Sequence, residues 1–580
     1  MRRVWTTGRG GNHRRLGERL VGLPSAGGRF RVALVFPNTY PVGMANLGFQ
    51  TVCRIVGEQA DTTCERVFLP MDRQGRPRPD WRPVSLESGR PLDAFDVVAF
   101  AAPFETDYLH LVQMLGAAGI EPRAARRRAA WPQVLVGGTG ASLNPEPVAP
   151  FADMVFIGEA EGALPGILMT LRELRATTRD RAAVQAALVH QPGLYLPAAY
   201  HAEIDGQGRF VGLTAQDGVP AAVVRQWLPT LAGLPTHSRF LTPDCAFGEM
   251  FLLEISRGCP RQCRFCTAGH FDNPPRHRPL AALLDEVREG LRWSRRVGLV
   301  APSPSDHPDF LALVEGIAAL GGEVSPSSIR IDHLGREVVA ALVRSGNRSL
   351  TLAPEAGSAR MRDVISKEFQ EPEILAAAEN LAAAGIDSAK LYMMVGLPGE
   401  SDADVAAIVD LVTKIREVFL PHWRRAGHTG RLTVSLNQFI PKPHTPFQWT
   451  PLEGLASVAA KVARLHEAFA ALGNVRLNAE APQQTLVEAA LSRADRRAAD
   501  LLEGVAAAGG RWRKVLPGWL ATTGTDLHRP IPHDAPLPWG HITTGLMPAY
   551  LRREEARGMK GKTNRPCPPD LVGCHKCGVC

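Results

Sequence analysis

The sequence Cys259-Pro260-Arg261-Gln262-Cys263-Arg264-Phe265-Cys266 places three cysteines on one short stretch with the spacing C-x3-C-x2-C. The apolar segment 250–255 precedes it and predicts a buried strand whose carboxyl end leads into this stretch. Three thiolates can hold three irons of a cubane iron–sulfur cluster, whereas a complete protein set would be four. The fourth iron would stay open to another ligand. A zinc site is the alternative, but zinc loops favour paired C-x2-C units.

The stretch resembles the cluster motif of the radical S-adenosylmethionine (SAM) enzymes, with Cys259, Cys263 and Cys266 at the three ligand positions. Phe265 also fits the resemblance, since an aromatic residue usually precedes the last cysteine in that family. The resemblance implies a [4Fe-4S] cluster whose open iron is chelated by the amino and carboxylate groups of SAM. An electron from an external donor of the flavodoxin or ferredoxin type would then cleave SAM and release a 5′-deoxyadenosyl radical.

The composition is that of a globular protein of several domains. With 580 residues, the chain is long enough for about three or four domains. Its hydrophobic content of 45% and its charged content of 21% are ordinary. The net charge of +8 comes from 66 basic and 58 acidic residues, and the arginines are spread along the chain apart from short runs such as Arg126-Arg127-Arg128. Such runs are usually solvated, so a nucleic-acid surface has only weak support.

The cysteines indicate the compartment. Seven of the ten fall in two tight groups, which is not the pattern of a disulfide framework. Clustered thiols predict metal ligands in a reducing environment. No segment approaches the roughly twenty apolar residues of a membrane span, and the N-terminal arginines are not followed by the apolar stretch of a signal peptide. We therefore expect a cytoplasmic protein without a membrane span.

Residues 30–165 predict an α/β domain with a parallel, doubly wound sheet. Short apolar strands alternate with helices, and the strands are expected at 31–36, 96–100, 133–136 and 154–157. Ligands of such sheets bind beyond the carboxyl ends of the strands. Here the third strand ends at Gly137-Gly138-Thr139-Gly140 and the fourth at Gly158-Glu159. The glycines would let the backbone approach a bulky ligand closely.

The order of parts resembles the radical SAM enzymes that carry a cobalamin-binding domain upstream. The first loop of corrinoid proteins reads Asp-x-His-x-x-Gly, and here it reads Asn38-Thr39-Tyr40-Pro41-Val42-Gly43. Gly43 is kept, but Asn38 and Tyr40 replace the aspartate and the cobalt-ligating histidine. The resemblance therefore implies cobalamin bound without a protein nitrogen below it. The other expected contacts are Gly137, Gly138, Thr139 and Glu159. The alternative is a Rossmann-like domain that binds no corrin.

Residues 246–475 predict an incomplete (β/α)6 barrel, which follows a mixed linker region at 166–245. Strands alternate with helices, and the strands are expected at 250–255, 297–300, 328–331, 349–352, 390–395 and 432–436. Six such units resemble the barrel of radical SAM proteins. Residues at the C-terminal ends of its strands should form the site.

Three strand ends carry candidate SAM contacts. Ser303 follows the second strand, where relatives often have Gly-Gly-Glu for the SAM amino group, and it could supply an acceptor. Glu355 follows the fourth strand, and the resemblance implies that its carboxylate accepts hydrogen bonds from the ribose hydroxyls. Gly396 opens the turn 396–400, which resembles the family's turn near the adenine. Singly, such residues also suit a helix start or an ordinary turn.

The segment 441–446 follows the sixth strand and resembles the Pro-Lys-Pro-x-Thr-Pro sequence of methylthiotransferases. It could present Lys442 or His444 to a substrate, or its prolines could only make a rigid turn. Residues 476–580 predict a small α-rich domain with a terminal cysteine set, Cys567, Cys574, Cys577 and Cys580. This spacing is closer to that of iron–sulfur proteins than to zinc knuckles. A second iron–sulfur cluster is therefore favoured, with a structural zinc as the alternative.

Together these features resemble the cobalamin-binding-domain radical SAM proteins, in an uncharacterised branch with a C-terminal cysteine cluster. The expected parts are an N-terminal arm at 1–29, a Rossmann-like domain at 30–165, the linker at 166–245, the barrel at 246–475 and the C-terminal domain at 476–580. The resemblance implies a cobalamin-dependent C-methyltransferase of unknown substrate. One alternative is a methylthiotransferase, or another radical SAM rearrangement, that uses the terminal cluster without cobalamin. The other is a nucleic-acid-binding protein with a structural cluster.

Overall fold

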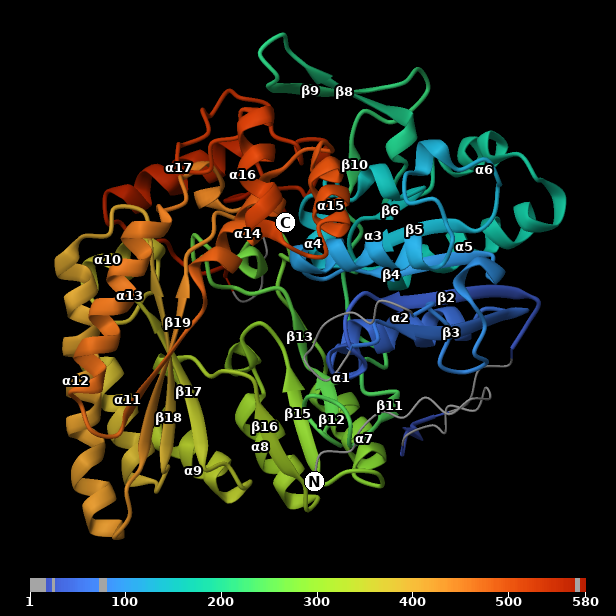
Figure 1. Ribbon diagram of the computed structural model, residues 1–580. Helices are drawn as coiled ribbons and strands as arrows, with labels where there is room; N and C mark the ends of the chain where they lie inside the picture. Colours follow the sequence, from blue (N-terminus) through green and yellow to red (C-terminus); the bar gives the residue numbers. More distant parts are fainter. Residues whose placement is uncertain (1–16, 23–26, 72–80, 569–573) are drawn as a thin grey trace.

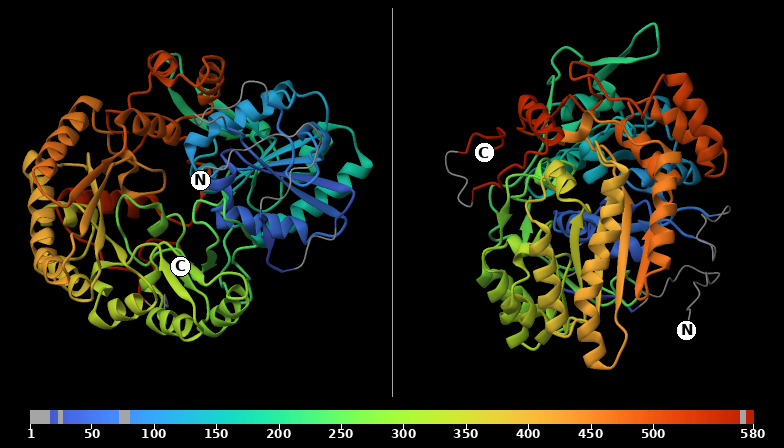
Figure 2. Two further views of the ribbon diagram at one scale, coloured as in Figure 1. Left: turned by 60° about the horizontal axis from the view of Figure 1, so that its bottom comes forward. Right: turned by 90° about the vertical axis from the view of Figure 1, so that its left-hand side faces the viewer.

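The computed structural model describes residues 17–22, 27–71, 81–568 and 574–580. Most of the N-terminal arm predicted at 1–29 therefore lies outside the described residues. Its described part includes β1 (Arg19–Leu20), which pairs antiparallel with β11 (Phe240–Leu241). Two units lie side by side, an N-terminal sheet with its helices and a curved barrel, as Figures 1 and 2 show.

The N-terminal unit is built on a six-stranded sheet with the strand order β3-β2-β4-β5-β6-β7. Its strands are β2 (Phe30–Phe36), β3 (Thr62–Phe68), β4 (Val97–Ala101), β5 (Gln133–Gly137), β6 (Met154–Phe156) and β7 (Leu194–Tyr195). All neighbours pair in parallel except β6 and β7. The four predicted strands are present. β3 was not predicted, because its centre holds Glu65 and Arg66, which are buried as partners of other polar groups.

Helices cover both faces of this sheet. One core lies between the sheet and two helices, α2 (Leu47–Gly57) and α5 (Ala160–Thr177). The other core contains α3 (Tyr108–Ala117) together with three helices from the C-terminal region. These are α14 (Pro482–Arg493), α15 (Ala498–Ala507) and α16 (Trp512–Thr523). The C-terminal region thus shares a core with the N-terminal unit instead of forming a separate one.

The barrel consists of two parallel sheets with the orders β12-β15-β16 and β17-β18-β19-β20. The strands are β12 (Phe251–Glu254), β15 (Arg296–Val300), β16 (Glu323–Pro326), β17 (Ser349–Glu355), β18 (Ser388–Val395), β19 (Arg431–Gln438) and β20 (Val475–Ala479). The strand predicted at 328–331 is wrong, because the third strand is β16. Ile329 and Ile331 follow it outside any strand and are buried, which explains their strand-like alternation. β20 adds a strand beyond the six that were predicted.

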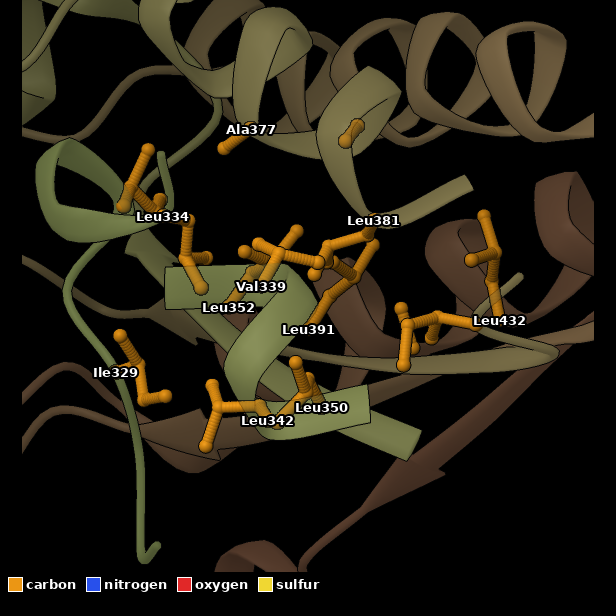
Figure 3. Close-up of a cluster of buried hydrophobic side chains, with 14 of the residues drawn as sticks. Ile329, Leu334, Val339, Leu342, Leu350, Leu352, Ala377, Leu381, Leu391 and Leu432 are labelled. Carbon is orange, nitrogen blue, oxygen red and sulfur yellow. The ribbon is translucent and has the colours of Figure 1, made fainter. Parts of the chain in front are cut away.

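Helices cover the outer face of the barrel (Figure 1). They are α7 (Leu280–Gly290), α8 (Phe310–Ala319), α9 (Arg336–Arg344), α11 (Glu371–Ala383), α12 (Asp402–Ala426) and α13 (Leu455–Ala470). Figure 3 shows strand residues Leu350, Leu352 and Leu391 near helix residues Leu342 and Leu381. Burying each such leucine contributes about 2 kcal/mol. This core holds the strands in place, and their C-terminal ends carry the candidate site.

The remaining elements connect the two units. The predicted linker contains α6 (Arg181–Leu188) and a hairpin of β8 (Tyr200–Ile204) and β9 (Phe210–Ala215), which projects from the molecule in Figure 1. The short β10 (Val223–Val224) pairs with β21 (Ile542–Thr543) of the C-terminal region. In the part of the chain described here, no helix combines the length and apolar character that a membrane crossing requires.

Candidate active site at the barrel mouth

The cluster loop, residues 259–266, begins after β12 and the short β13 (Ser256–Arg257), as the sequence predicted. Gly258 sits between β13 and the first cysteine with a φ of +70°. A Cβ atom there would lie 2.6 Å from the carbonyl oxygen of Pro274 and 2.7 Å from that of Asp272. The chain can turn into the loop only because this residue is a glycine.

The three thiols of the loop lie in a partly buried setting. Cys263 is 8% exposed, and Cys259 and Cys266 are half-buried. Burial raises the pKa of Cys266 to about 11, and the charge of Cys263 contributes to the rise. Burial also raises the pKa of Cys259, followed by the charges of Cys263 and Cys266. Thiolates in such a place need metal ions to compensate their charge, and three thiols on one loop suit a cubane with an open iron.

The described residues contain no preformed site for a metal ion. Within the described ranges, no group of three or more His, Cys, Asp or Glu side chains is arranged to hold a metal ion. The metal-ligand roles expected for both cysteine sets therefore stay predictions from their spacing and, for the cluster loop, from the resemblance.

Arg264 anchors the loop from within and is fully buried. Its guanidinium donates to the carbonyl oxygens of Asp363 (3.0 Å) and Val364 (2.8 Å) in α10 (Ala359–Ile365). It also forms a 3.1 Å ion pair with Glu554 of α17 (Pro548–Met559). The loop is thereby joined to two helices at once.

Arg261 anchors the opposite side of the loop. Its guanidinium lies 2.6 Å from the carboxylate of Asp306, which also accepts a 2.6 Å hydrogen bond from the hydroxyl of Ser303. Burial acts to raise the pKa of Asp306, but the bonds from Arg261 and Ser303 lower it below its usual value. Ser303, predicted to contact SAM, is thus engaged in holding the loop.

Phe265 joins the loop to two of the predicted strand ends. It packs against an apolar cluster that includes Ala356, which follows Glu355, and Leu397, which follows Gly396. The structure therefore brings together the cluster loop and the ends of β17 and β18. This agrees with the expectation from sequence that the ends of parallel strands gather at one mouth of the barrel.

Glu355 has an unusual backbone for its residue type, with a φ of +66° at a register shift in β17. Left-handed φ values in non-glycine residues cost free energy and often occur at functional sites. Its carboxylate lies 3.5 Å from the ammonium of Lys367. Burial raises the pKa of Glu355, and Lys367 partly opposes this rise. Sequence reasoning found Glu355 but missed Lys367, which lies in no motif.

Gly396 occupies the turn after β18, with a φ of +81° that favours glycine. Its amide donates a 2.8 Å hydrogen bond to the carboxylate of Glu400. Lys461 of α13 lies 2.7 Å from that carboxylate and 2.7 Å from Glu453. These contacts fix the turn that was expected to lie near the adenine.

A cavity of about 970 Å³ separates the N-terminal unit from the barrel. On one side it is lined by α2 and by residues that follow β4, β5 and β6. On the other side it is lined by β12, β15, the end of β16 and Gly258, the residue before the first cluster cysteine. Much of the lining is apolar, for example Leu47, Val52, Leu252 and Val300. The cavity therefore extends from the carboxyl edge of the sheet to Gly258, the residue before the cluster loop, and its volume is at the upper end for ligand sites.

The residues predicted for the corrin domain divide into two groups. Gly137, Gly138, Thr139 and Glu159 line the cavity. Gly138 has a φ of +108°, and a Cβ atom there would lie 2.8 Å from the carbonyl carbon of Ala102. The close turn thus requires glycine at this position.

The first predicted loop is placed differently. Asn38, Tyr40 and Gly43 are not among the described residues that line the cavity. Tyr40 begins the short helix α1 (Tyr40–Met44), and its hydroxyl lies 2.6 Å from Glu18. Asn38 donates a 2.8 Å hydrogen bond to Asp107, and Gly43 lies against Phe68. These three residues stabilise the N-terminal unit next to the site.

Of the polar residues at this part of the cavity, Glu159 was predicted from the sequence, whereas Arg257, Glu161 and Glu254 were not. Arg257, which precedes Gly258, lies 3.1 Å from Glu159, 2.5 Å from Glu161 and 2.9 Å from Glu254. Burial opposes the charge of Arg257, but the three carboxylates raise its pKa above the usual value. The first two carboxylates belong to the N-terminal unit, so this ion cluster joins the two units beside the cluster loop. An isolated arginine gives no sequence signal of such a role.

The segment after β19 also joins the units. The ammonium of Lys442 lies 2.7 Å from Glu105 and 2.8 Å from Glu488. The Nε2 atom of His444 lies 3.1 Å from the carbonyl oxygen of Leu143, and burial lowers the pKa of His444 to about 3. Both side chains have protein partners, which favours the structural reading of this segment.

The terminal cysteine set lies next to the cluster loop. The amide of Cys567 donates a 2.7 Å hydrogen bond to the carbonyl oxygen of Pro260, and the amide group of Gln262 lies 3.2 Å from the Cys567 sulfur. Burial raises the pKa of Cys567 to about 11, and the charges of the other three cysteines add to this rise. The hydroxyl of Tyr550 in α17 donates to the side-chain amide oxygen of Gln262. No sequence pattern indicates this contact.

Comparisons with known proteins agree with this geometry. The sequence model of the radical SAM superfamily matches residues 253–412, and that of the N-terminal part of radical SAM proteins matches residues 48–197. An uncharacterized protein of Methanocaldococcus jannaschii is 27% identical over 419 residues, which are 72% of this chain and 79% of that protein.

Two further similar proteins have a lower sequence identity. A tRNA-2-methylthio-N(6)-dimethylallyladenosine synthase of Maricaulis maris is 25% identical over 29% of this chain and 41% of its own length. This alignment thus spans less than half of that enzyme. The radical SAM methyltransferase TsrM of Kitasatospora setae, solved with tryptophan and a SAM analogue, has a TM-score of 0.48 and 13% identity over 92% of this chain and 96% of its own.

Proposed function

Because the chain belongs to the radical SAM superfamily, we propose that it cleaves SAM reductively at a [4Fe-4S] cluster held by Cys259, Cys263 and Cys266. We further propose that it transfers a methyl group to a carbon atom of its substrate with the help of cobalamin. The observation that carries the second part is the cavity of about 970 Å³ between the N-terminal sheet and the barrel. One end of this cavity lies at Gly258, directly before the cluster loop.

When bound, the cluster would supply the electron that cleaves SAM, and cobalamin would carry the methyl group. The protein binds and orients these groups and keeps water away. Glu355 would accept hydrogen bonds from the ribose hydroxyls of SAM, with Lys367 holding its carboxylate in the charged form. The turn at Gly396 would position the adenine.

A corrin in the cavity would be held by shape and apolar contact. Gly137 and Gly138 lie at the edge of the sheet, where a large planar ligand can approach the backbone closely. None of the described residues that line the cavity is a histidine. This supports the prediction of cobalamin bound without a nitrogen ligand from the protein.

Methylthiolation is the second candidate, favoured by the position of Cys567 against the cluster loop. A sulfur donor must face the substrate, however. No terminal cysteine is among the described residues that line the cavity, and Lys442 has two carboxylate partners. We therefore rank this reaction below methyl transfer.

The proposal is tested on protein purified without oxygen from cells supplied with cobalamin. Iron, sulfide and corrinoid are measured, and SAM with dithionite is assayed for methionine and 5′-deoxyadenosine. About four irons per chain would match the cluster loop alone, and about eight would add the terminal set. A corrinoid-free protein with two clusters would favour methylthiolation. A cluster-loaded protein that does not cleave SAM would overturn the proposal and leave the nucleic-acid-binding alternative.

A Val52→Trp variant is expected to lose most of its bound corrinoid while it keeps its iron. Val52 lies on α2 and lines the cavity, so an indole there would occupy the space of the ligand. The control is Val42→Trp on the adjacent helix α1, where the side chain is 38% exposed and is not part of the cavity lining. Corrinoid absorbance and iron content of both variants are compared. Equal corrinoid in both would contradict the assignment of the cavity.

A further inference from the structure

A second hollow, of about 390 Å³, lies on the surface beside the terminal cysteines. It is lined by the end of α17 and the segment that follows, and four basic residues dominate it: Arg553, Arg557, Arg565 and Lys576. We call it the cationic hollow. Arg553 and Arg565 are exposed. The described residues 552–568 and 574–576 hold seven basic and two acidic residues.

The two acidic residues do not neutralise the hollow toward solvent. Glu554 is buried, and its carboxylate lies 3.1 Å from Arg264 of the cluster loop and 3.3 Å from Arg557. Glu555 lies 2.6 Å from His533. The surface of the hollow therefore presents a positive potential, which attracts an anionic partner and speeds its association.

The wall of the hollow is bonded directly to the cluster loop. Glu554, which lines it, pairs with Arg264, the residue between Cys263 and Phe265. Asn564, which also lines the hollow, donates a 3.1 Å hydrogen bond to the hydroxyl of Tyr550. This hydroxyl in turn donates a hydrogen bond to the side-chain amide oxygen of Gln262. Cys567 follows the lining residue Pro566 and donates to Pro260. The hollow thus lies directly behind the cluster loop, and Figure 1 shows α17 beside α10 at this place.

The hollow and the large cavity have no lining residue in common. A partner on the hollow would therefore leave the substrate cavity free. This separation matters because the proposed reaction needs an electron from outside at each SAM cleavage, while the substrate occupies the other side.

We propose that the cationic hollow is the docking surface of the acidic one-electron carrier protein that reduces the cluster of the proposed function, on which this inference rests. In each event one electron leaves the reduced carrier and enters the cluster, and the carrier departs oxidised by one electron. The carrier binds through carboxylates to Arg553, Arg565 and their basic neighbours. The contacts that join the wall of the hollow to Arg264, Gln262 and Pro260 place this docking surface next to the loop that the electron must reach.

The test measures electron delivery to the cluster-loaded protein with reduced flavodoxin as the probe. The variant Arg553→Glu/Arg565→Glu is expected to slow cluster reduction by flavodoxin about tenfold at low salt, because charges at a docking rim act mainly on association. The difference should shrink as salt screens the charges. The matched control is Arg513→Glu/Lys514→Glu, an exposed pair on α16, which should reduce at the wild-type rate. The single variant Arg565→Glu should slow reduction by flavodoxin less than the double variant does.

Dithionite separates this inference from the function on which it rests, because it needs no docking surface. If the wild-type protein does not cleave SAM even with dithionite, the proposed function fails. If dithionite drives cleavage but flavodoxin reduces all variants equally fast, the docking surface alone is refuted. Loss of tRNA binding in the hollow variants, with unchanged reduction by flavodoxin, would also overturn it and assign the hollow to a nucleic acid.

Discussion

An Arg264→Met variant is expected to lose most of its iron–sulfur cluster and to be destabilised by about 3–5 kcal/mol. Arg264 lies in the centre of the cluster loop and is fully buried. Burial acts to lower the pKa of its guanidinium, so the charge depends on its partners. Methionine has a similar length but makes none of the hydrogen bonds to Asp363 and Val364.

Most of the destabilisation is expected to come from the Glu554 carboxylate, which loses its partner. Glu554 is buried beside Arg264. When Arg264 is replaced, the Glu554 carboxylate loses this partner and keeps the 3.3 Å ion pair with Arg557. A buried charge that loses its partner costs far more than the ion pair itself contributes. The loop would also lose its tie to α10 and α17, so the three thiols would no longer be held as one ligand set.

The measurement is the iron and sulfide content of anaerobically purified protein, together with unfolding in urea. Arg513→Met on α16 is the control, because Arg513 is exposed. If Arg264→Met does not fold, Glu554→Gln tests the same pair with a milder change. The double variant Arg264→Met/Glu554→Met should be less destabilised than the sum of the two single changes. Full iron and control-like stability in Arg264→Met would contradict this reading of the loop.

The parts of the site that are local in sequence could be predicted. The strand before the cysteines, the cluster loop and the turns after β17 and β18 each follow from a few adjacent residues. Their meeting at one mouth follows from the parallel order of the strands. The prediction of a strand at 328–331 was wrong because a local pattern can also mislead. Ile329 and Ile331 have the spacing of a strand, but they are buried beyond the end of β16 and outside any strand.

The contacts between distant segments could not be predicted. Arg257 meets carboxylates of the N-terminal unit, and Lys442 meets Glu105 and Glu488. Cys567 contacts Pro260. Each involves single charged or polar residues with no periodic pattern, and each depends on how two units pack. Spacing within a motif predicts ligands, whereas only the fold identifies their neighbours.

A Lys367→Met variant is expected to make SAM binding depend on pH. Lys367 is 11% exposed and lies 3.5 Å from Glu355. Burial acts to lower the pKa of Lys367, but the charge of Glu355 and the cluster-loop thiolates raise it above the usual value. The ammonium is therefore charged at neutral pH and stabilises the carboxylate form of Glu355. Methionine removes this cation while the burial of Glu355 remains, so the pKa of Glu355 should rise further.

The raised pKa of Glu355 should affect SAM affinity and protein stability in opposite directions as the pH changes. SAM binding is expected to need the carboxylate, because protonation turns one carboxyl oxygen into an O–H donor and weakens its acceptance from the ribose hydroxyls. Affinity for SAM should therefore fall as pH falls, and this fall should begin at a higher pH in the variant than in the wild type. The total loss should be about tenfold, which corresponds to roughly one hydrogen bond to a charged group. Stability should change in the other direction. The folded state binds the proton more tightly than the unfolded chain, so the free energy of unfolding falls as pH rises through the raised pKa of Glu355.

Calorimetric titration of SAM and urea unfolding, both without oxygen and from roughly pH 6 to pH 8, check these signs. Lys367→Arg keeps a cation near Glu355 and should follow the wild-type profiles. Flat SAM affinity in Lys367→Met would mean that Glu355 does not bind the ribose as a carboxylate. An affinity change without the opposite change in stability would place the titrating group in SAM or in the cluster, because a raised pKa of Glu355 must act on both quantities.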